Sequence, residues 1–116
     1  MMRIAVAVAL ILLLTTPSSA GEEPLFVIHF TVGPSWNKEK PPAEQEHFSE
    51  HSANLGALRK AGTILFGARY EEVGMIVVRS TSLDSARELI ESDPGVAAGL
   101  FTFTIAPLYP FYEWKE

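Results

Sequence analysis

The segment HFSEH contains the residues of this sequence that most directly suggest chemistry. It places His47 and His51 four residues apart, with Glu50 immediately before the second histidine. This H-x-x-E-H order is the zinc-binding signature of the inverted metallopeptidases, in which two histidines one helical turn apart hold the metal and the glutamate acts on its water. Zinc binding is therefore one hypothesis for the segment.

A catalytic zinc also needs a third protein ligand and an open position for water. In a helix, the face that carries both histidines also carries Phe48, Leu55 and Leu58, which are needed to cover the core. A metal between this helix and a sheet would displace that packing. We therefore expect no metal site. The alternatives are histidines satisfied by hydrogen bonds within the fold and, less favoured, zinc bound through His47 and His51.

Other catalytic signatures are absent from the sequence. It contains no cysteine, no G-x-S-x-G nucleophile motif and no glycine-rich phosphate loop. We therefore expect neither a conventional nucleophile nor a bound cofactor. Proton transfer on a small aromatic or lactone-like molecule is the simplest chemistry that remains.

The first twenty residues are typical of a secretory signal peptide. Arg3 precedes an apolar run from Ile4 to Leu14, and the segment ends in the small residues SSA. An uncleaved membrane anchor is the alternative, but about 20 apolar residues are needed to cross a bilayer. We predict a signal peptide over residues 1–20, a mature domain over residues 21–116, and a secreted or periplasmic protein.

Charge and length restrict the partners of the mature chain. The formal net charge of -5 becomes -6 when Arg3 is removed, and no cluster of lysine and arginine is present. Such a chain offers no electrostatic surface for nucleic acid or anionic lipid. Its length suits one compact domain. We expect a small-molecule ligand or substrate, a second copy of the chain as partner, no nucleic acid, and no stable membrane insertion after cleavage.

The spacing of apolar residues indicates the elements that must position these side chains. It predicts the order strand, helix, strand, strand, helix, strand, at residues 25–32, 43–61, 63–70, 74–80, 82–93 and 99–108. This is the ferredoxin-like βαββαβ order of class α+β, with two helices on one face of a four-stranded antiparallel sheet. The other face would stay apolar and uncovered, so we expect a homodimer that packs sheet against sheet.

Two longer runs of the sequence share features with a known family. They are HSANLGALRKAGTILFGA, from His51, and SARELIESDPGVAAGLFTFTIAPLYPF, from Ser85. A helix histidine precedes the helix-ending Gly62 by eleven residues, and a D-P dipeptide followed by VAAG precedes the last strand. Over residues 25–111 the chain resembles the YCII-related (YciI-like) family of the dimeric α/β-barrel superfamily. It departs from that family at GAR, which ends at Arg69 where the family usually has an A-G-P-like sequence.

The resemblance implies an active-site dyad of His51 and Asp93, from the first helix and the end of the second. A carboxylate close to an imidazole fixes its tautomer and favours the charged imidazolium, which suits a general acid or base. Lyase, isomerase and hydrolase chemistry all remain open, because related proteins of one fold catalyse different reactions. The structural alternative is that Asp93 caps a loop and His51 is a satisfied core residue.

The remaining site predictions concern the pocket around the dyad. We predict that Phe48, Arg69 and Tyr70 bind the substrate, and that the C-terminal YPFYEW segment completes the dimer contact or lines the pocket mouth. His29, in the first strand, is expected to be structural. The competing function is a non-catalytic module that holds a hydrophobic metabolite between Phe48, Tyr70 and the C-terminal aromatic residues.

Overall fold

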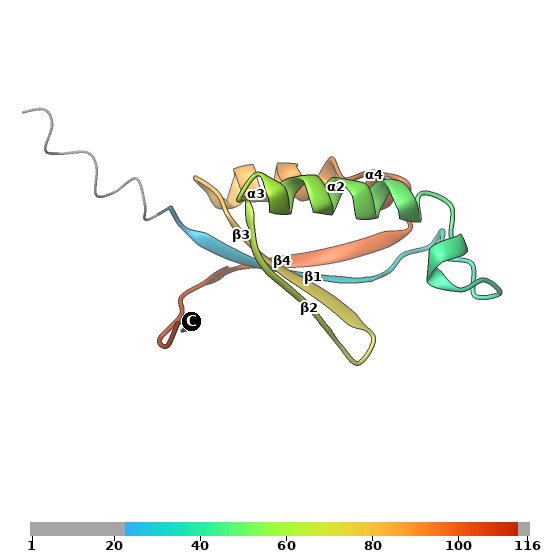
Figure 1. The fold of residues 1–116 in the computed structure, drawn as a ribbon, viewed down its shortest axis with the longest axis horizontal. Coiled ribbons are helices and arrows are strands. Elements are labelled where there is room, and N and C mark those ends of the chain that lie inside the picture. The colour runs from blue at the N-terminus through green and yellow to red at the C-terminus, as the bar shows by residue number, and fades with distance from the viewer. Residues whose placement is uncertain (1–22, 114–116) are drawn as a thin grey trace, which may run out of the picture.

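The described part of the chain forms a four-stranded antiparallel sheet covered by helices on one face (Figure 1). The computed structural model describes residues 23–113, so the predicted signal peptide over residues 1–20 lies outside the described residues. The strands have the spatial order β2-β3-β1-β4. They are β1 (Leu25–Val32), β2 (Ile64–Tyr70), β3 (Val73–Arg79) and β4 (Phe101–Leu108). This arrangement confirms the predicted α+β, ferredoxin-like fold.

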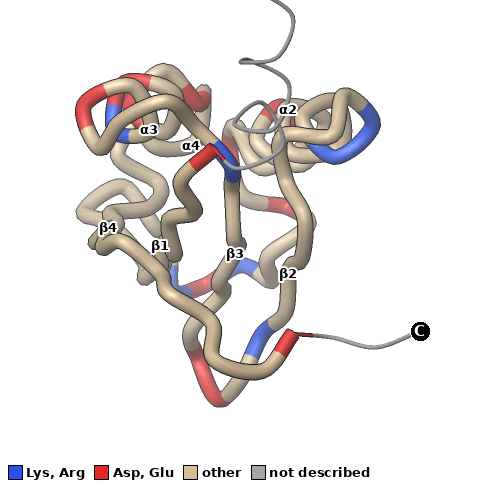
Figure 2. The backbone as a smooth tube through the Cα atoms, turned by 90° about the vertical axis from the view of Figure 1, so that its left-hand side faces the viewer, with Lys and Arg blue, Asp and Glu red and all other residues tan. Residues whose placement is uncertain are grey.

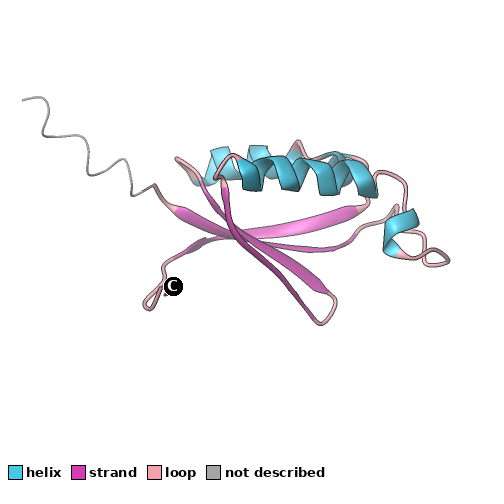
Figure 3. Cartoon of the chain, in the orientation of Figure 1, coloured by secondary structure: helices cyan, strands magenta, loops and turns pink. Residues whose placement is uncertain are grey.

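Both main helices lie side by side over the same face of the sheet. In the end-on view, α2 (Phe48–Lys60) lies above β2 and α3 (Leu83–Glu91) lies above β4 (Figure 2). The short helix α4 (Pro94–Ala97) follows α3 and leads into β4 (Figure 3). Within residues 23–113, no helix combines the length and apolar character needed to cross a bilayer.

The core lies between the helices and one face of the sheet. Successive side chains of a strand point to opposite faces, and on β1 those of Phe26, Ile28 and Phe30 point to the helices and are buried. Burial of each such side chain stabilises the fold by about 1.5 to 3 kcal/mol. On β3, Phe26 faces Val78 and Phe30 faces Gly74. The interface with the helices therefore changes from large paired side chains at one end to a glycine at the other.

No helix of the described chain covers the opposite face of the sheet. Val27 and His29 of β1 lie on this open face, and Val27 pairs with Val77 of β3. Phe66 and Tyr70 of β2 are 45% and 51% exposed there. An apolar sheet face of this kind is the surface for which we predict a homodimer.

The first helix begins later than predicted. Residues 43–61 were expected to be helical, but α2 begins at Phe48 and is preceded by a turn of 3-10 helix, η1 (Pro42–Glu44). His47 lies between them with a φ of 71°, in the left-handed region. The helical prediction was therefore wrong for the residues before Phe48, and His47 lies outside the helix.

Gln45 supplies a physical reason for this late start. Its side-chain amide donates hydrogen bonds to the carbonyls of Asn37 (2.7 Å) and Lys40 (2.9 Å). Its Oε1 accepts a third bond from the N–H of Asn37 at 2.9 Å. The side chain is buried, so these bonds satisfy an amide that would otherwise be costly to desolvate. They hold the chain before α2 as a compact loop rather than as a further helical turn.

The second helix begins as predicted and ends slightly earlier. Ser82 caps α3, accepting a hydrogen bond from the N–H of Ser85 at 3.0 Å. The helix ends at Glu91, and the small-residue stretch after Asp93 is helical rather than a loop. Proline fits the first turn of a helix because its missing N–H has no partner to lose there, which lets Pro94 begin α4.

Candidate functional site

His51 lies in the first turn of α2 and is almost completely buried. It is 7% exposed, and its ring packs among Phe30, Phe48 and Phe101 at centroid separations of 5.5, 6.1 and 4.6 Å. These three rings fix the plane of the imidazole. Buried polar groups are nearly always hydrogen-bonded, so a ring held in this position needs a polar partner.

Asp93 lies at the corner between α3 and α4 and is 1% exposed. Its backbone is extended because the following Pro94 disfavours helical geometry in the residue before it. From this position, the carboxylate accepts hydrogen bonds from the N–H groups of Gly95 (2.9 Å) and Val96 (3.2 Å). Asp93 is therefore the N-cap of the helix α4, whereas the structural alternative had it cap a loop.

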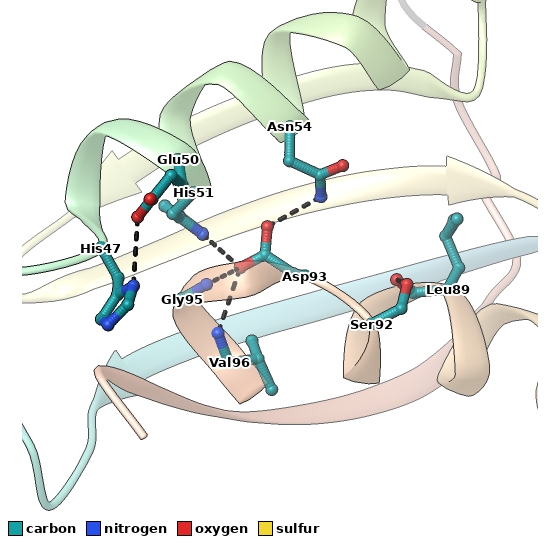
Figure 4. Close-up of polar contacts among 9 residues, drawn as sticks. All are labelled: His47, Glu50, His51, Asn54, Leu89, Ser92, Asp93, Gly95 and Val96. Carbon is teal, nitrogen blue, oxygen red and sulfur yellow. Dashed lines mark hydrogen bonds and ion pairs between the residues drawn. The ribbon is translucent and has the colours of Figure 1, made fainter. Parts of the chain in front are cut away.

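Asp93 also pairs with His51, so the carboxylate caps α4 and contacts the imidazole at the same time. Nδ1 of His51 lies 2.6 Å from Oδ2 of Asp93 (Figure 4). An ionised carboxylate only accepts hydrogen bonds, so Nδ1 of His51 carries the proton in this contact. Among the described residues, no group is hydrogen-bonded to Nε2 of His51. The pair thus leaves Nε2 as the imidazole nitrogen available to a ligand.

Asn54 completes the surroundings of the carboxylate and was not predicted. Its Nδ2 donates to Oδ1 of Asp93 at 2.8 Å, from one helical turn beyond His51 (Figure 4). The H-x-x-N spacing was the available signal, because residues three apart lie on the same face of a helix. Burial alone raises the pKa of the Asp93 carboxyl. The hydrogen bonds from His51 and Asn54 outweigh that effect, so this pKa lies below its ordinary value and the group is ionised at neutral pH.

Gly95 permits the close approach between α4 and α2. A Cβ atom at this position would lie 2.9 Å from Cβ of His51 and 3.1 Å from its Cγ. Any larger residue would therefore push the imidazole away from Asp93. The glycine in the D-P-G sequence is part of the geometry of the dyad, although it contributes no polar side chain.

A cavity of about 550 Å³ adjoins His51. It lies between α2, the end of β1 and the β2–β3 hairpin, and its wall includes Phe30, Trp36, Phe48, Leu55 and Phe101. The hairpin contributes Gly67 and Gly74, and a Cβ atom at Gly74 would meet nothing within 4 Å. The missing side chains on the sheet leave the space into which His51 faces. A concave, mostly apolar site with few polar groups is typical of small-molecule binding.

The structure brings together some of the predicted site residues and separates others. Phe48 and Arg69 line the cavity with His51, while Asp93 lies behind the imidazole and is absent from the cavity wall. Tyr70 lies on the open face of the sheet, where its ring contacts His29 edge to face at 6.2 Å. The described part of the chain therefore offers Arg69 to the cavity and directs Tyr70 away from it.

A β-bulge explains why Arg69 and Tyr70 lie on opposite faces. The register of β2 against β3 shifts between Ile64 and Phe66. Strict alternation from the buried Ile64 would place Tyr70 under the helices. The extra residue reverses the alternation, so that Arg69 comes opposite Gly74 on the helix side. One inserted residue thus exchanges the faces of all the side chains that follow it.

Trp36 and Glu72 also line the cavity and were not predicted as site residues. Trp36 comes from the loop that Gln45 holds, and its ring lies 5.8 Å from that of Phe101. The C-terminal aromatic residues Tyr109 and Phe111 are strongly exposed and do not line this cavity. Of the two roles predicted for the C-terminal segment, its described residues do not fill the one at the pocket mouth, and the loop before α2 provides aromatic cover there instead.

The two histidines of HFSEH have different roles in the structure. His47 lies before the first turn of α2, and its Nδ1 contacts Oε1 of Glu50 at 3.1 Å on the surface (Figure 4). His51 directs Nδ1 inward to Asp93. Within residues 23–113, no cluster of three or more histidine, aspartate and glutamate side chains is arranged to hold a metal ion. The geometry separates the histidine pair that the zinc hypothesis requires.

No protein-family model and no curated protein matches the chain. Among solved structures, the chain is similar to muconolactone isomerase, with a TM-score of 0.59 and 14% identity over 79% of this chain and 97% of that one. It is also similar to 5-chloro-2-hydroxyhydroquinone dehydrochlorinase (TftG) from Burkholderia phenoliruptrix AC1100 in complex with 2,5-dihydroxybenzoquinone. That match has a TM-score of 0.48 and 21% identity over 78% of this chain and 93% of that one. The likeness to muconolactone isomerase supports the ferredoxin-like fold.

Proposed function

We propose that this protein is an acid–base enzyme that moves a proton on a small organic molecule, with His51 as the catalytic residue and Asp93 as its positioning residue. The observation that carries the proposal is the 2.6 Å contact between Nδ1 of His51 and Oδ2 of Asp93 beside an apolar cavity. A buried carboxylate with this many donors is built to hold one imidazole in one orientation.

The geometry suggests a simple sequence of proton transfers. Neutral His51 accepts a proton on Nε2 from an acidic C–H or O–H of the substrate. The imidazolium then formed is stabilised by the ionised carboxylate of Asp93, which keeps its own hydrogen bonds throughout. Return of the proton to another atom of the same molecule completes an isomerisation, and return to a leaving group completes an elimination. In both reactions, His51 and Asp93 are the protein groups that hold or stabilise the proton.

The family, location and assembly of the protein form part of the same proposal. The resemblance of the sequence supports a YCII-related protein, and the apolar run near the N-terminus supports export to the periplasm or the medium. The apolar open face of the sheet supports a homodimer packed sheet against sheet. Mass measurement of the mature protein tests cleavage after Ala20, and sedimentation tests the dimer.

Solvent deuterium exchange tests the catalytic proposal without a known substrate. The protein is incubated in D2O with enolisable ketones, butenolides and hydroxyquinones, and deuterium incorporation is followed by NMR. We expect catalysed exchange in at least one compound, with a loss of at least about 100-fold in His51→Ala, because general acid–base catalysis contributes about 10²- to 10⁴-fold. His47→Ala is the matched control, since its side chain lies on the surface.

The alternative outcomes have distinct meanings. Exchange that survives in His51→Ala contradicts the proposed role of the imidazole, and a panel without catalysed exchange contradicts the proposed reaction class. A compound that protects the protein thermally but is recovered without deuterium favours the non-catalytic binding module. Asp93→Asn should also reduce exchange, because an amide cannot stabilise the imidazolium as a carboxylate does.

A further inference from the structure

Arg69 introduces a positive charge into a mostly apolar cavity. The other ionisable residues of the cavity wall are His51 and Glu72. Arg69 lies on the helix side of β2, directly opposite Gly74 in the register of the hairpin. Because glycine has no side chain, the strand opposite offers no group to cover or neutralise the guanidinium. The bulge in β2 thus places the positively charged side chain of Arg69 on the side of the sheet that faces the cavity.

The guanidinium of Arg69 has no hydrogen bond or ion pair with another residue in the described range 23–113. Arg59 provides a contrast within the same fold, because its guanidinium donates to the carbonyls of Ile64 (3.0 Å) and Leu65 (2.9 Å). Arg59 is thereby committed to the helix–strand connection. Arg69 keeps its donors for a molecule in the cavity, in a chain whose acidic residues outnumber its basic ones.

The shape of the remaining wall favours a flat ring. Trp36, Phe48 and Phe101 lie close together, with their ring centroids 5.8 and 6.4 Å apart along the series Trp36–Phe101–Phe48. Aromatic rings at such separations attract another ring in stacked or edge-to-face contact. A guanidinium presents a planar fork of donors that matches both oxygens of a carboxylate. The cavity therefore combines a ring-binding wall with a carboxylate-binding cation.

We propose that the cavity binds a planar aromatic carboxylate, with its ring against Trp36, Phe48 and Phe101 and its carboxylate on the guanidinium of Arg69. This inference rests on the proposed function, for which it names the substrate class. The carboxylate fixes one end of the molecule, so that the ring or its substituent is presented to Nε2 of His51. Arg69 is thus a specificity-determining residue, and His51 remains the residue that transfers the proton.

Matched pairs of acid and amide measure this preference directly. The probes are 2-naphthoate with 2-naphthamide and cinnamate with cinnamamide, titrated into the full-length mature chain at pH 7 and followed by two-dimensional NMR. We expect each carboxylate to bind at least about tenfold more tightly than its amide, since hydrogen bonds between charged groups are stronger than those of a neutral amide. Arg69→Met should abolish the preference while retaining ring binding. Arg87→Met removes the same charge from the exposed surface of α3 and should preserve the preference.

Glu72 offers a second test, because it places a negative charge on the same cavity wall as Arg69. Glu72→Gln should strengthen carboxylate binding and leave amide binding unchanged. The proposal is overturned if neither carboxylate binds, if the amides bind as tightly, or if the preference persists in Arg69→Met. Any of these results could be obtained while deuterium exchange still depends on His51. The proposal about the substrate class can therefore be contradicted without contradicting the proposed catalytic role of His51. Conversely, a carboxylate preference that survives in His51→Gln without any exchange supports this binding mode and counts against catalysis.

Discussion

The interface between the sheet and the helices differs at its two ends, although the same strands form both. At one end, Phe26 pairs with Val78 and Ile64 pairs with Val78, and all three side chains are buried. At the other end, Phe30 and Arg69 both come opposite Gly74. We call these the packed end and the hollow end. The buried side chains of the packed end stabilise the fold, and the cavity lies at the hollow end.

The buried polar groups of the dyad also lie at the hollow end rather than at the packed end. The packed end buries apolar side chains, which stabilise the fold without needing partners. The dyad lies at the hollow end, where Asp93 is buried only because several donors surround it. Empty space beside an ordered polar pair costs stability that a continuous core would provide. Such a local departure from optimal packing is expected where a fold holds a functional site.

Truncation at the packed end should have the largest effect on stability. Ile64→Ala removes a buried side chain of the core and should lower the free energy of unfolding by about 2 to 5 kcal/mol. Urea denaturation measures this loss, and Ile64→Val should cost only about 0.5 to 1.5 kcal/mol. In the absence of urea, where the variant is still folded, its affinity for 2-naphthoate should be unchanged. A large loss of binding in folded Ile64→Ala would show that the two ends do not act separately.

Local sequence signals predicted most of the packed end and little of the hollow end. The β-branched and aromatic run LFVIHFTV predicted the first strand, and the apolar spacing after Ser82 predicted the second helix. These signals depend on near neighbours in the chain. The D-P corner and the small-residue stretch located Asp93, but the pairing with His51 was taken from a family resemblance, because the two residues are 42 positions apart.

The hollow end depends on interactions that periodicity does not show. The bulge after Ile64 changes the face of Arg69 and Tyr70, and a bulge is decided by pairing with another strand. The late start of α2 depends on the hydrogen bonds of Gln45 to the loop before it. Gly74 reads in the sequence as an ordinary strand glycine, and only the register shows that it leaves space beneath His51 and Arg69.

Neutralising the buried carboxylate should have an intermediate effect that depends on pH. The pKa of Asp93 is lower in the folded state, so the unfolded state binds more protons and stability decreases as pH falls through the acidic range. This contribution is complete above the ordinary carboxyl pKa of about 3.9 and is lost progressively below it. At pH 7, Asp93→Asn should lower the free energy of unfolding by about 1 to 3 kcal/mol, because an amide cannot satisfy all of the donors.

The difference between wild type and Asp93→Asn should therefore become smaller as pH is lowered from 6 to 3. Denaturation curves at several pH values measure it, and Asp84→Asn controls for the loss of one charge at an exposed position of α3. A gap that stays constant or widens toward pH 3 would contradict the assignment of Asp93 as an ionised cap and partner. Gly95→Ala keeps both side chains but separates them, and should weaken the same pH dependence.

Filling the hollow end should change stability least and binding most. A Cβ atom at Gly74 meets nothing within 4 Å, and this glycine does not have a positive φ, so Gly74→Leu adds a side chain without backbone strain. We expect the free energy of unfolding to change by less than about 1 kcal/mol, since an added β-strand side chain offsets the poor strand propensity of glycine. Binding of 2-naphthoate should fall by more than about tenfold, because the side chain occupies the space beneath Arg69. Gly56→Leu is the control, as it adds the same bulk to the exposed surface of α2. Unchanged binding in Gly74→Leu would mean that the ligand does not use this cavity, whereas a large loss of stability would mean that the hollow end is packed after all.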